Sequence, residues 1–514
     1  MKKQIFALTI IFSLIMFSAQ KLINPIIPGF HPDPSVVYAK GYFYIVNSSF
    51  HYFPGVPIFR SKDLINWEQI GNVLNRESQL PLKDTNSWTG IYAPTIRYNE
   101  GIFYMITTNV GNGGNFMVTA TDPKGPWSEP IPLKQEGIDP SLYFEDKKVY
   151  MVSNPDATIT LCEIDPITGE QLTEGKALWR GTGGRHPEGP HIYKKDGWYY
   201  LLISEGGTEL AHRLTIARSK DIYGPYEASP NNPILTNCNQ KGQSSQIQAT
   251  GHGDFVQDEN GSWWVVFLAY RNFVGSYHHL GRETFLAPVE WKEGEWPIIN
   301  NGNAINIEMD VPTLAEKKAK LKRDSKIDPN SFEWLYIQNP IEDNYLFEEG
   351  KLTMTASKSS LTENNNPSFL GRRQESPSFY METEINISSL SEGCKAGLTV
   401  YQIHDGHFDL SVKKSNSSLE VLFEHKIKSL VGEKKVKIDN LIEKLKLRVT
   451  SDAEKYFFEY SVDDGKNFEK IDEQDIFLVS TEVVGGFTGL TIGMFAQGEG
   501  KAEFDYFDYT ENES

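Results

Sequence analysis

The chain has 514 residues and a formal net charge of −18 at pH 7. This length exceeds that of one small module, and the acidic excess opposes binding to nucleic acid or anionic lipid, because like charges repel. Hydrophobic residues make up 39% and charged residues 23%, a balance typical of folded rather than disordered chains. With 42 Gly, 27 Pro and 12% aromatic residues, the composition favours many short strands joined by tight turns.

Residues 1–19 have the pattern of a secretory signal peptide. Two lysines follow Met1, an apolar run occupies residues 5–17, and the small residues Ser18 and Ala19 close the segment. The run is shorter than the roughly 20 apolar residues that a membrane-spanning helix needs. We therefore expect export to the periplasm or the cell exterior, with no membrane insertion after the signal is removed. The sequence is compatible with a monomer and with a homo-oligomer.

An aromatic strand pattern then recurs five times within residues 22–311. Its anchor residues are Tyr44, Tyr104, Tyr150, Tyr200 and Trp264. The spacings are somewhat longer than the roughly 40 to 50 residues of one four-stranded propeller blade, which leaves room for loop insertions. The repeat predicts an all-β fold, with a five-bladed β-propeller over residues 20–312.

A short polar element precedes each of these anchors by 11 or 12 residues. Its first residues are Asp33, Ala93, Asp139, Glu188 and His252. If these elements begin the innermost strands, the five side chains surround the propeller axis. An Asp before Pro often only caps a turn, and for one acid alone that interpretation would be preferred. Three acids in register favour a shared chemical role.

Three carboxylates around an axis fit hydrolysis of a glycosidic bond with inversion. One carboxylate activates water, and a protonated carboxyl about 6.5 to 9.5 Å away donates to the leaving oxygen. A third acid can keep these two in opposite protonation states, because like charge raises the pKa of a neighbour. A site for a hard cation is the alternative use of such a ring. The three acids are not grouped in one loop, as ligands of a high-affinity site usually are.

Six motifs, in order along the chain, resemble those of glycoside hydrolase family 43. They are the strings PGFHPDPS at 28–35, SSFHYFPGVPIFRSKDL at 48–64, APTIRY at 93–98, GIDPS at 137–141, EGPHIY at 188–193 and GRETF at 281–285. More narrowly, the chain is similar to the β-xylosidases and α-L-arabinofuranosidases that carry a C-terminal β-sandwich. The resemblance implies a five-bladed propeller, in agreement with the repeat.

The resemblance also implies roles for individual residues. Asp33 matches the general base, Glu188 the general acid, and Asp139 the acid that orients the general acid and modulates its pKa. Arg282 matches an arginine that reaches sugar hydroxyls in the innermost subsite. His252 matches an axial histidine that in some members supports a water-coordinated cation. No cofactor is expected for the chemistry, and a structural Ca²⁺ at the propeller axis is left open.

Aromatic residues near the acids are the expected substrate contacts. Phe30 and Tyr92 flank the acidic elements, and Phe487 of the C-terminal region matches a ring that relatives place at the pocket rim. Tyr92 stands where many relatives have Trp, which leaves the shape of the subsite wall open. The expected partner is a xylo- or arabinoxylo-oligosaccharide substrate.

The C-terminal third has a different residue pattern. Residues 313–330 form a charged stretch without strand alternation and are interpreted as a linker. Nine alternating runs over residues 331–514 predict a concanavalin-like β-sandwich, an accessory domain without paired acids. Without the resemblance, this domain fits an independent carbohydrate-binding module equally well.

The sequence thus predicts an exo-acting, inverting glycosidase that releases xylose from the non-reducing end of xylo-oligosaccharides, a xylan 1,4-β-xylosidase. The alternative is an α-L-arabinofuranosidase, or a bifunctional enzyme, acting on arabinoxylan or arabinan side chains. A retaining propeller enzyme for sucrose or fructan is disfavoured, because no Asn-Asp-Pro-Asn-Gly string stands near the start. A non-catalytic sugar-binding propeller is the hypothesis outside the enzyme class.

Overall fold

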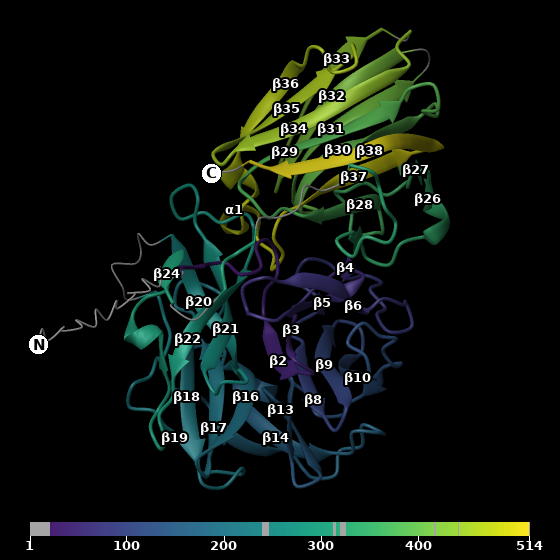
Figure 1. Ribbon diagram of the computed structural model, residues 1–514. Helices are drawn as coiled ribbons and strands as arrows, with labels where there is room; N and C mark the ends of the chain where they lie inside the picture. The colour runs from purple at the N-terminus through teal and green to yellow at the C-terminus, as the bar shows by residue number, and fades with distance from the viewer. Residues whose placement is uncertain are drawn as a thin grey trace, which may run out of the picture.

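The computed structural model describes residues 21–238, 246–311, 315–318, 325–415, 418–439 and 441–512. The predicted signal peptide and much of the predicted linker lie outside these residues. The described chain consists mainly of β-strands, so the all-β prediction is confirmed (Figure 1). Within this part of the chain, no helix is long and apolar enough to cross a membrane.

Five antiparallel sheets follow one another between residues 35 and 299. The first contains β2 (Ser35–Ala39), β3 (Tyr42–Val46), β5 (Gly55–Ser61) and β6 (Glu68–Leu74). The second contains β7 (Gly90–Ile91), β8 (Thr95–Asn99), β9 (Ile102–Val110), β10 (Gly114–Ala120) and β11 (Ile131–Pro132). The third contains β12 (Ser141–Glu145), β13 (Lys148–Ser153), β14 (Ile159–Ile164) and β15 (Lys176–Trp179). The fourth contains β16 (Glu188–Lys195), β17 (Trp198–Glu205), β18 (Arg213–Ser219) and β19 (Glu227–Ala228). The fifth contains β20 (Ile247–Gln257), β21 (Trp263–Arg271), β22 (Glu283–Glu290) and β23 (Ile298–Ile299).

The first strands of the five sheets form a closed circle. β2 contacts β8, β8 contacts β12, β12 contacts β16, β16 contacts β20, and β20 contacts β2 again. The aromatic anchors of the repeat fall on the second strands, β3, β9, β13, β17 and β21. In the first four sheets, two-residue turns with positive φ at both positions, such as Lys40-Gly41, join first and second strands because their twist matches that of a hairpin. The polar elements before the anchors therefore lie at this inner circle.

A buried charged network ties several of these inner strands together. Asp254 on β20 is completely buried and accepts hydrogen bonds from Arg97 (2.8 Å), Ser35 (2.7 Å) and the Tyr193 hydroxyl (2.5 Å). Burial acts to raise the pKa of Asp254, but Arg97 and His191 outweigh burial and hold that pKa at about 2. The carboxylate is thus ionised, and it links the first, second, fourth and fifth sheets.

The C-terminal region forms two further antiparallel sheets (Figure 1). One has the order β26 (Tyr345–Glu348), β27 (Lys351–Thr355), β38 (Lys501–Glu511), β29 (Ser378–Asn386), β34 (Lys444–Asp452), β35 (Lys455–Ser461) and β36 (Glu469–Asp475). The other has the order β28 (Ser368–Arg373), β37 (Thr491–Gly498), β30 (Cys394–Ile403), β31 (Gly406–Ser415), β32 (Ser418–Ile427) and β33 (Leu430–Ile438). A continuous hydrophobic core draws on both sheets, and all nine predicted runs fall on strands.

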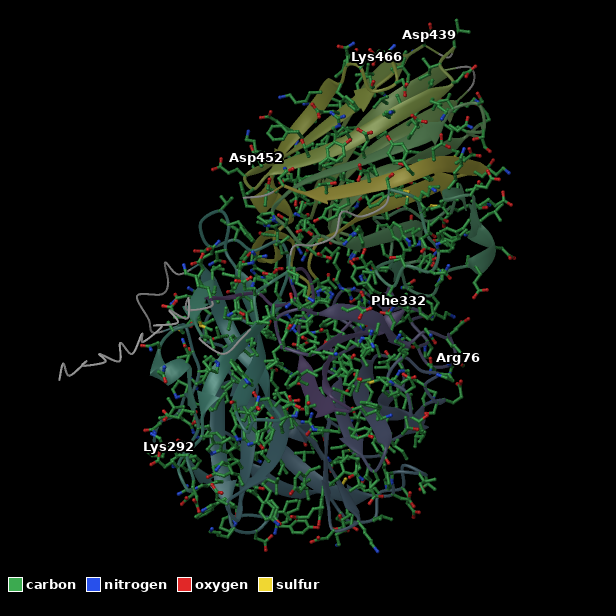
Figure 2. The ribbon with its side chains drawn as sticks, viewed as in Figure 1. Arg76, Lys292, Phe332, Asp439, Asp452 and Lys466 are labelled. Carbon is green, nitrogen blue, oxygen red and sulfur yellow. The ribbon has the colours of Figure 1, made fainter. Side chains whose placement is uncertain are left out.

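Direct contacts join the C-terminal region to the first five sheets. β25 (Tyr336–Ile337) pairs with β4 (Tyr52–Phe53). The carbonyl of Phe332 accepts hydrogen bonds from Gln69 and Asn72, and Figure 2 shows Phe332 where the two parts of the molecule meet. These contacts hold the C-terminal region against the side of the molecule that carries Asp33.

Candidate active site

The acids occupy unusual backbone positions at the inner circle. Asp33 and Asp139 each lie two residues before the first strand of their sheet, with φ of 52° and 54°. His252 lies in β20 with φ 45°, where the register to β21 shifts. Left-handed backbone is uncommon for residues with a side chain, although Asp tolerates it, and it persists only where the surroundings enforce it. Glu188 is the first residue of β16. Four of the five repeat positions thus carry a polar group at the start of, or within, an inner strand.

Asp33 is buried and held by three groups. Its Oδ1 accepts a hydrogen bond from Arg282 Nη1 at 2.9 Å, its Oδ2 accepts one from the Ser48 hydroxyl at 2.6 Å, and His252 Nδ1 lies 3.8 Å from Oδ1. Burial acts to raise the pKa of Asp33, but Arg282, His252 and Ser48 together outweigh it and lower that pKa below 3.8. Asp33 is therefore an ionised acceptor at neutral pH, as a general base must be.

Asp139 and Glu188 behave as a pair. Burial raises the pKa of Asp139 well above 3.8, and the charges of Glu188 and Asp33 raise it further. The amide of Gly189 donates to Asp139 at 3.2 Å and only partly offsets this rise. Asp139 consequently keeps its proton to a higher pH than an isolated carboxyl group does. Glu188 remains the more accessible member, with 13% of its side chain exposed.

Arg282 connects the two ends of the chain at this site. Its Nη1 binds Asp33, and its Nη2 donates to the backbone carbonyl of Phe487 at 3.1 Å. The amide of Phe487 in turn donates to the carbonyl of Ser87. A backbone group of the C-terminal region therefore fixes the direction of the guanidinium that neutralises Asp33.

Aromatic rings surround Arg282. The rings of Phe50 and Phe487 lie 5.5 and 5.7 Å from its guanidinium carbon, and Tyr92 packs on both rings. Burial raises the pKa of Tyr92 to about 12, opposed by Arg282 and reinforced by the charges of the three acids. Trp88 continues this wall outward, with its ring 4.8 Å from Phe487 and 45% of the residue exposed.

The structure places the predicted contact residue Phe30 behind this wall. Phe30 is 0% exposed, and its ring packs on Phe50 and Tyr52. Its ring therefore supports the wall from the core and is not presented to a ligand here. Tyr92 and Phe487 are both partly exposed and pack on each other beside Arg282, and their contact with substrate stays a prediction.

His252 does not by itself make a metal centre. Burial lowers its pKa, although Asp33 and Glu188 oppose that shift, so the ring is neutral at pH 7 and could act as a ligand. Among the residues that the structure describes, no group of three or more His, Cys, Asp or Glu side chains could hold a metal ion. A cation at His252 would need water for most of its coordination, and it stays a prediction.

Two polar neighbours of the acids were not identified from the sequence. Ser48 binds Asp33, and His212 places Nε2 3.3 Å from Glu188 Oε1. Ser48 lies within one of the six motifs, so the motif could have indicated it. His212 stands before a third strand, outside the repeated element, and its sequence surroundings carry no comparable signal.

A Gly-rich segment at 181–184 is held by Glu205, not by a ligand. The completely buried carboxylate of Glu205 accepts hydrogen bonds from the amides of Thr182 and Gly184 and from the hydroxyls of Thr182 and Thr215. All four donors are groups of the protein itself. A phosphate-binding role for this loop is therefore unsupported.

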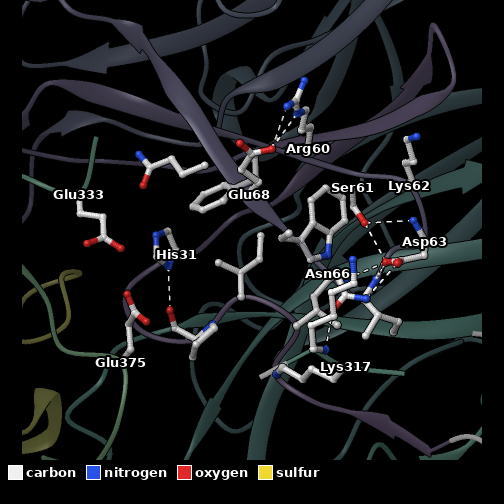
Figure 3. Close-up of a pocket in the computed structure, with 18 of the residues that line it drawn as sticks. His31, Arg60, Ser61, Lys62, Asp63, Asn66, Glu68, Lys317, Glu333 and Glu375 are labelled. Atoms are coloured by element: carbon white, nitrogen blue, oxygen red, sulfur yellow. Dashed lines mark hydrogen bonds and ion pairs between the residues drawn. The ribbon is translucent and has the colours of Figure 1, made fainter. Parts of the chain in front are cut away.

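A separate cavity of about 670 Å³ lies elsewhere, between residues 26–69 and the C-terminal region (Figure 3). None of the three acids lines it. Arg60 pairs with Glu68, and Asp63 accepts hydrogen bonds from Ser61 and Asn66, so these side chains already satisfy one another. The acidic centre at the inner circle is the stronger candidate for chemistry.

Comparison with known proteins agrees with this centre. The model of the glycosyl hydrolases family 43 matches residues 22–297, and that of the beta xylosidase C-terminal concanavalin A-like domain matches residues 328–510. The chain belongs to glycoside hydrolase family 43 and is a glycosidase.

Similar proteins cover almost the whole chain. It is 38% identical over 502 residues to a non-reducing end alpha-L-arabinofuranosidase of Bacteroides ovatus, covering 95% of this chain and 94% of that protein. It is 40% identical over 515 residues to a xylosidase/arabinosidase of Butyrivibrio fibrisolvens, covering 95% and 98%. The solved structure of a xylan beta-1,4-xylosidase from Bacillus halodurans is similar with a TM-score of 0.88 and 32% identity, covering 95% of this chain and 100% of that one.

Proposed function

We propose that this protein is an exo-acting, inverting glycosidase that releases xylose from the non-reducing end of xylo-oligosaccharides. The observation that carries the proposal is the convergence of three acids, Asp33, Asp139 and Glu188, at the inner circle, where the pKa values of two of them are shifted in opposite directions. The pKa of Asp33 is lowered, whereas the pKa of Asp139 is raised well above its ordinary value. An inverting site needs one ionised carboxylate and one protonated carboxyl at the same pH.

The roles follow from these contacts. Asp33 accepts a proton from the attacking water, whose oxygen forms a bond to the anomeric carbon. Glu188, the more accessible member of the pair, donates its proton to the glycosidic oxygen as that bond breaks and the electron pair moves to oxygen. Asp139 lies beside Glu188, and because ionising both carboxyl groups is unfavourable, the two acids share one proton, which Glu188 delivers.

Several features support a neutral pentose as substrate. Arg282 is largely occupied by Asp33 and the Phe487 carbonyl, so it can add hydrogen bonds to sugar hydroxyls without presenting a free charge. Tyr92, Phe487 and Trp88 form an apolar wall that suits the face of a sugar ring. Relatives carrying the names xylosidase and xylosidase/arabinosidase support the same substrate class.

The architecture supports removal of terminal units. We interpret the five sheets as the blades of a propeller over residues 20–312, followed by a linker at 313–330 and a β-sandwich at 331–514. The network around Asp254 and Arg97 links four of the inner strands with side chains that are buried or nearly so. A channel filled in this way makes a pocket closed at one end, which accepts a chain terminus and excludes the middle of a polysaccharide.

Release of α-L-arabinofuranose is the second candidate, because the relative from Bacteroides ovatus carries that activity in its name. The same three acids would serve, and only the shape of the sugar subsite would differ. Rates on 4-nitrophenyl β-D-xyloside and 4-nitrophenyl α-L-arabinofuranoside decide between them. A higher kcat/KM on the arabinofuranoside would refute the xylosidase assignment.

Two further experiments test the chemistry. Proton NMR of the first sugar released should show the inverted anomer, and retention would refute the mechanism. Glu188→Ala should lower kcat/KM by about 10³-fold on xylobiose but far less on an aryl xyloside, because an activated phenolate leaves without protonation. An equal loss on both substrates would argue against Glu188 as the general acid.

We also propose export through residues 1–19 and chemistry that needs no cofactor. A cell-fractionation experiment that finds the full-length chain in the cytoplasm would refute export. Treatment with a chelator should leave kcat on the aryl xyloside within about twofold while lowering the midpoint of thermal unfolding if Ca²⁺ occupies the axis near His252.

A further inference from the structure

His212 stands directly behind the proposed general acid. It precedes β18, and it is 0% exposed. Its Nδ1 lies 3.1 Å from the carbonyl oxygen of Ala249, and its Nε2 lies 3.3 Å from Glu188 Oε1. Among the described residues this buried Nε2 has no hydrogen-bond partner, and Glu188 is the charged group that approaches it. The ring therefore has two neighbours, a backbone carbonyl and the carboxyl group of Glu188.

The chemistry of these neighbours dictates where protons must lie. A carbonyl oxygen only accepts hydrogen bonds, so the contact with Ala249 requires a proton on Nδ1. A bare Nε2 would then either face an oxygen lone pair of Glu188, which is unfavourable in a buried site, or accept the acid's own proton and turn it away from the substrate. A proton on Nε2 avoids both arrangements and makes the contact a hydrogen bond.

Close packing fixes the ring in this orientation. A Cβ atom on Gly251 would lie 2.4 Å from His212 Nδ1, so the absence of a side chain at Gly251 makes room for the imidazole. Gly251 is on β20, next to His252, and the ring thus sits between the fourth and fifth sheets. The charged or titratable groups that act on it are Glu188, Asp33 and His252.

We propose that His212 is a positioning residue for Glu188. Nε2–H donates to Oε1 and holds the carboxyl group, so that Oε2 is the oxygen that carries the transferable proton toward the substrate. This inference deepens the proposed function and rests on it, because it gives the proposed general acid a partner.

The proton balance of the step is complete. In the proposed arrangement Nδ1–H donates to the Ala249 carbonyl, Nε2–H donates to Oε1, and Oε2 of Glu188 carries the transferable proton. The Oε2–H bond of Glu188 breaks, its proton goes to the glycosidic oxygen, and the bond from that oxygen to the anomeric carbon breaks. The carboxylate left on Glu188 is then stabilised by Nε2–H, which retains its own proton.

The test compares His212→Phe, which keeps a buried ring but removes both nitrogens, with His212→Gln, which keeps an N–H donor. On xylobiose, the Phe variant should lose about 10²-fold in kcat, the usual cost of removing one preorganised donor. On 4-nitrophenyl β-xyloside it should lose no more than about tenfold, because that leaving group needs little protonation. The Gln variant should recover a substantial part of the xylobiose rate. The matched control is His407→Phe, which removes a buried histidine facing a carboxylate, 3.0 Å from Asp409, in the C-terminal region.

Equal losses on the two substrates, or a Gln variant no better than the Phe variant, would show a merely structural role and overturn the proposal. If the variants do not fold, ¹⁵N NMR of histidine-labelled wild-type protein at pH 6 decides, with both His212 nitrogens expected to be protonated. A His212 ring with one bare nitrogen would overturn the proposal. If the wild-type chain cleaves neither substrate, the proposed function fails, and the NMR result alone then decides the protonation of His212.

Discussion

Gly489→Ala should impair catalysis without touching a catalytic side chain. A Cβ atom at Gly489 would lie 2.2 Å from the Leu280 carbonyl oxygen and 2.8 Å from the Cα of Gly281. Because these are backbone atoms, the 487–489 segment must move by about 1 Å to reach ordinary contact distances. The hydrogen bond from Arg282 to the Phe487 carbonyl is 3.1 Å long, and a shift of this size would break it.

The expected magnitude follows from that bond. A hydrogen bond to a charged group contributes about 1.5–3 kcal/mol, which corresponds to a loss of between about 10- and 100-fold in kcat/KM. The assay is steady-state hydrolysis of an aryl β-xyloside, with circular dichroism to confirm folding. Gly493→Ala is the control, because its Cβ would lie 2.4 Å from the Leu370 carbonyl oxygen, within the C-terminal sheets. Unchanged kcat/KM in a folded Gly489→Ala protein, or an equal loss in the control, would refute the reasoning.

Two predictions concern pH and stability. Because the pKa of Asp33 is lowered, kcat/KM of the wild type should fall on the acidic side only below pH 3.8. Ser48→Ala should move this acidic decline upward by about one pH unit, because it removes a hydrogen bond to the Asp33 carboxylate. An unchanged pH profile would contradict a role for that hydrogen bond in lowering the pKa of Asp33. Asp254→Asn should lower the free energy of unfolding, measured in urea, by about 3–5 kcal/mol, because it leaves Arg97, with only 16% of its side chain exposed, without its charged partner. The stabilisation from Asp254 should be fully present above about pH 4 and be lost as pH falls through about 2, the value of its folded-state pKa, so a loss of stability confined to alkaline pH would contradict this sign.

The sequence predicted those features that repeat. The aromatic anchors recur because each sheet buries a second strand of the same kind, and their fixed distance from Asp33, Asp139 and Glu188 placed these acids at one circle of strands. The nine alternating runs of the C-terminal region fall on strands of its two sheets, some with one buried face, such as β34, and some buried on both, such as β30. Four strands of these sheets, β26, β28, β33 and β36, were missed; in β33 most residues are exposed and the sequence does not alternate.

Features that depend on contacts between distant segments could not be predicted. The complete burial of Phe30 results from packing against Phe50 and Tyr52 and cannot be read from its neighbours in sequence. His212 reaches Glu188 only because two sheets meet around Gly251. The role of Phe487 was expected from its ring, whereas the structure shows that its backbone carbonyl also orients Arg282.

The chain of contacts from Asp33 through Arg282 to the Phe487 carbonyl has a consequence for biosynthesis. Domains generally fold in the order in which the ribosome releases them, so the sheets bearing the acids can assemble while residue 487 is still to be made. Until then the guanidinium lacks its second anchor, although every acid is in place. Full hydrolytic competence should consequently appear late, when translation is almost finished, and a polypeptide terminated before residue 487 should hydrolyse sugars more slowly than the complete chain.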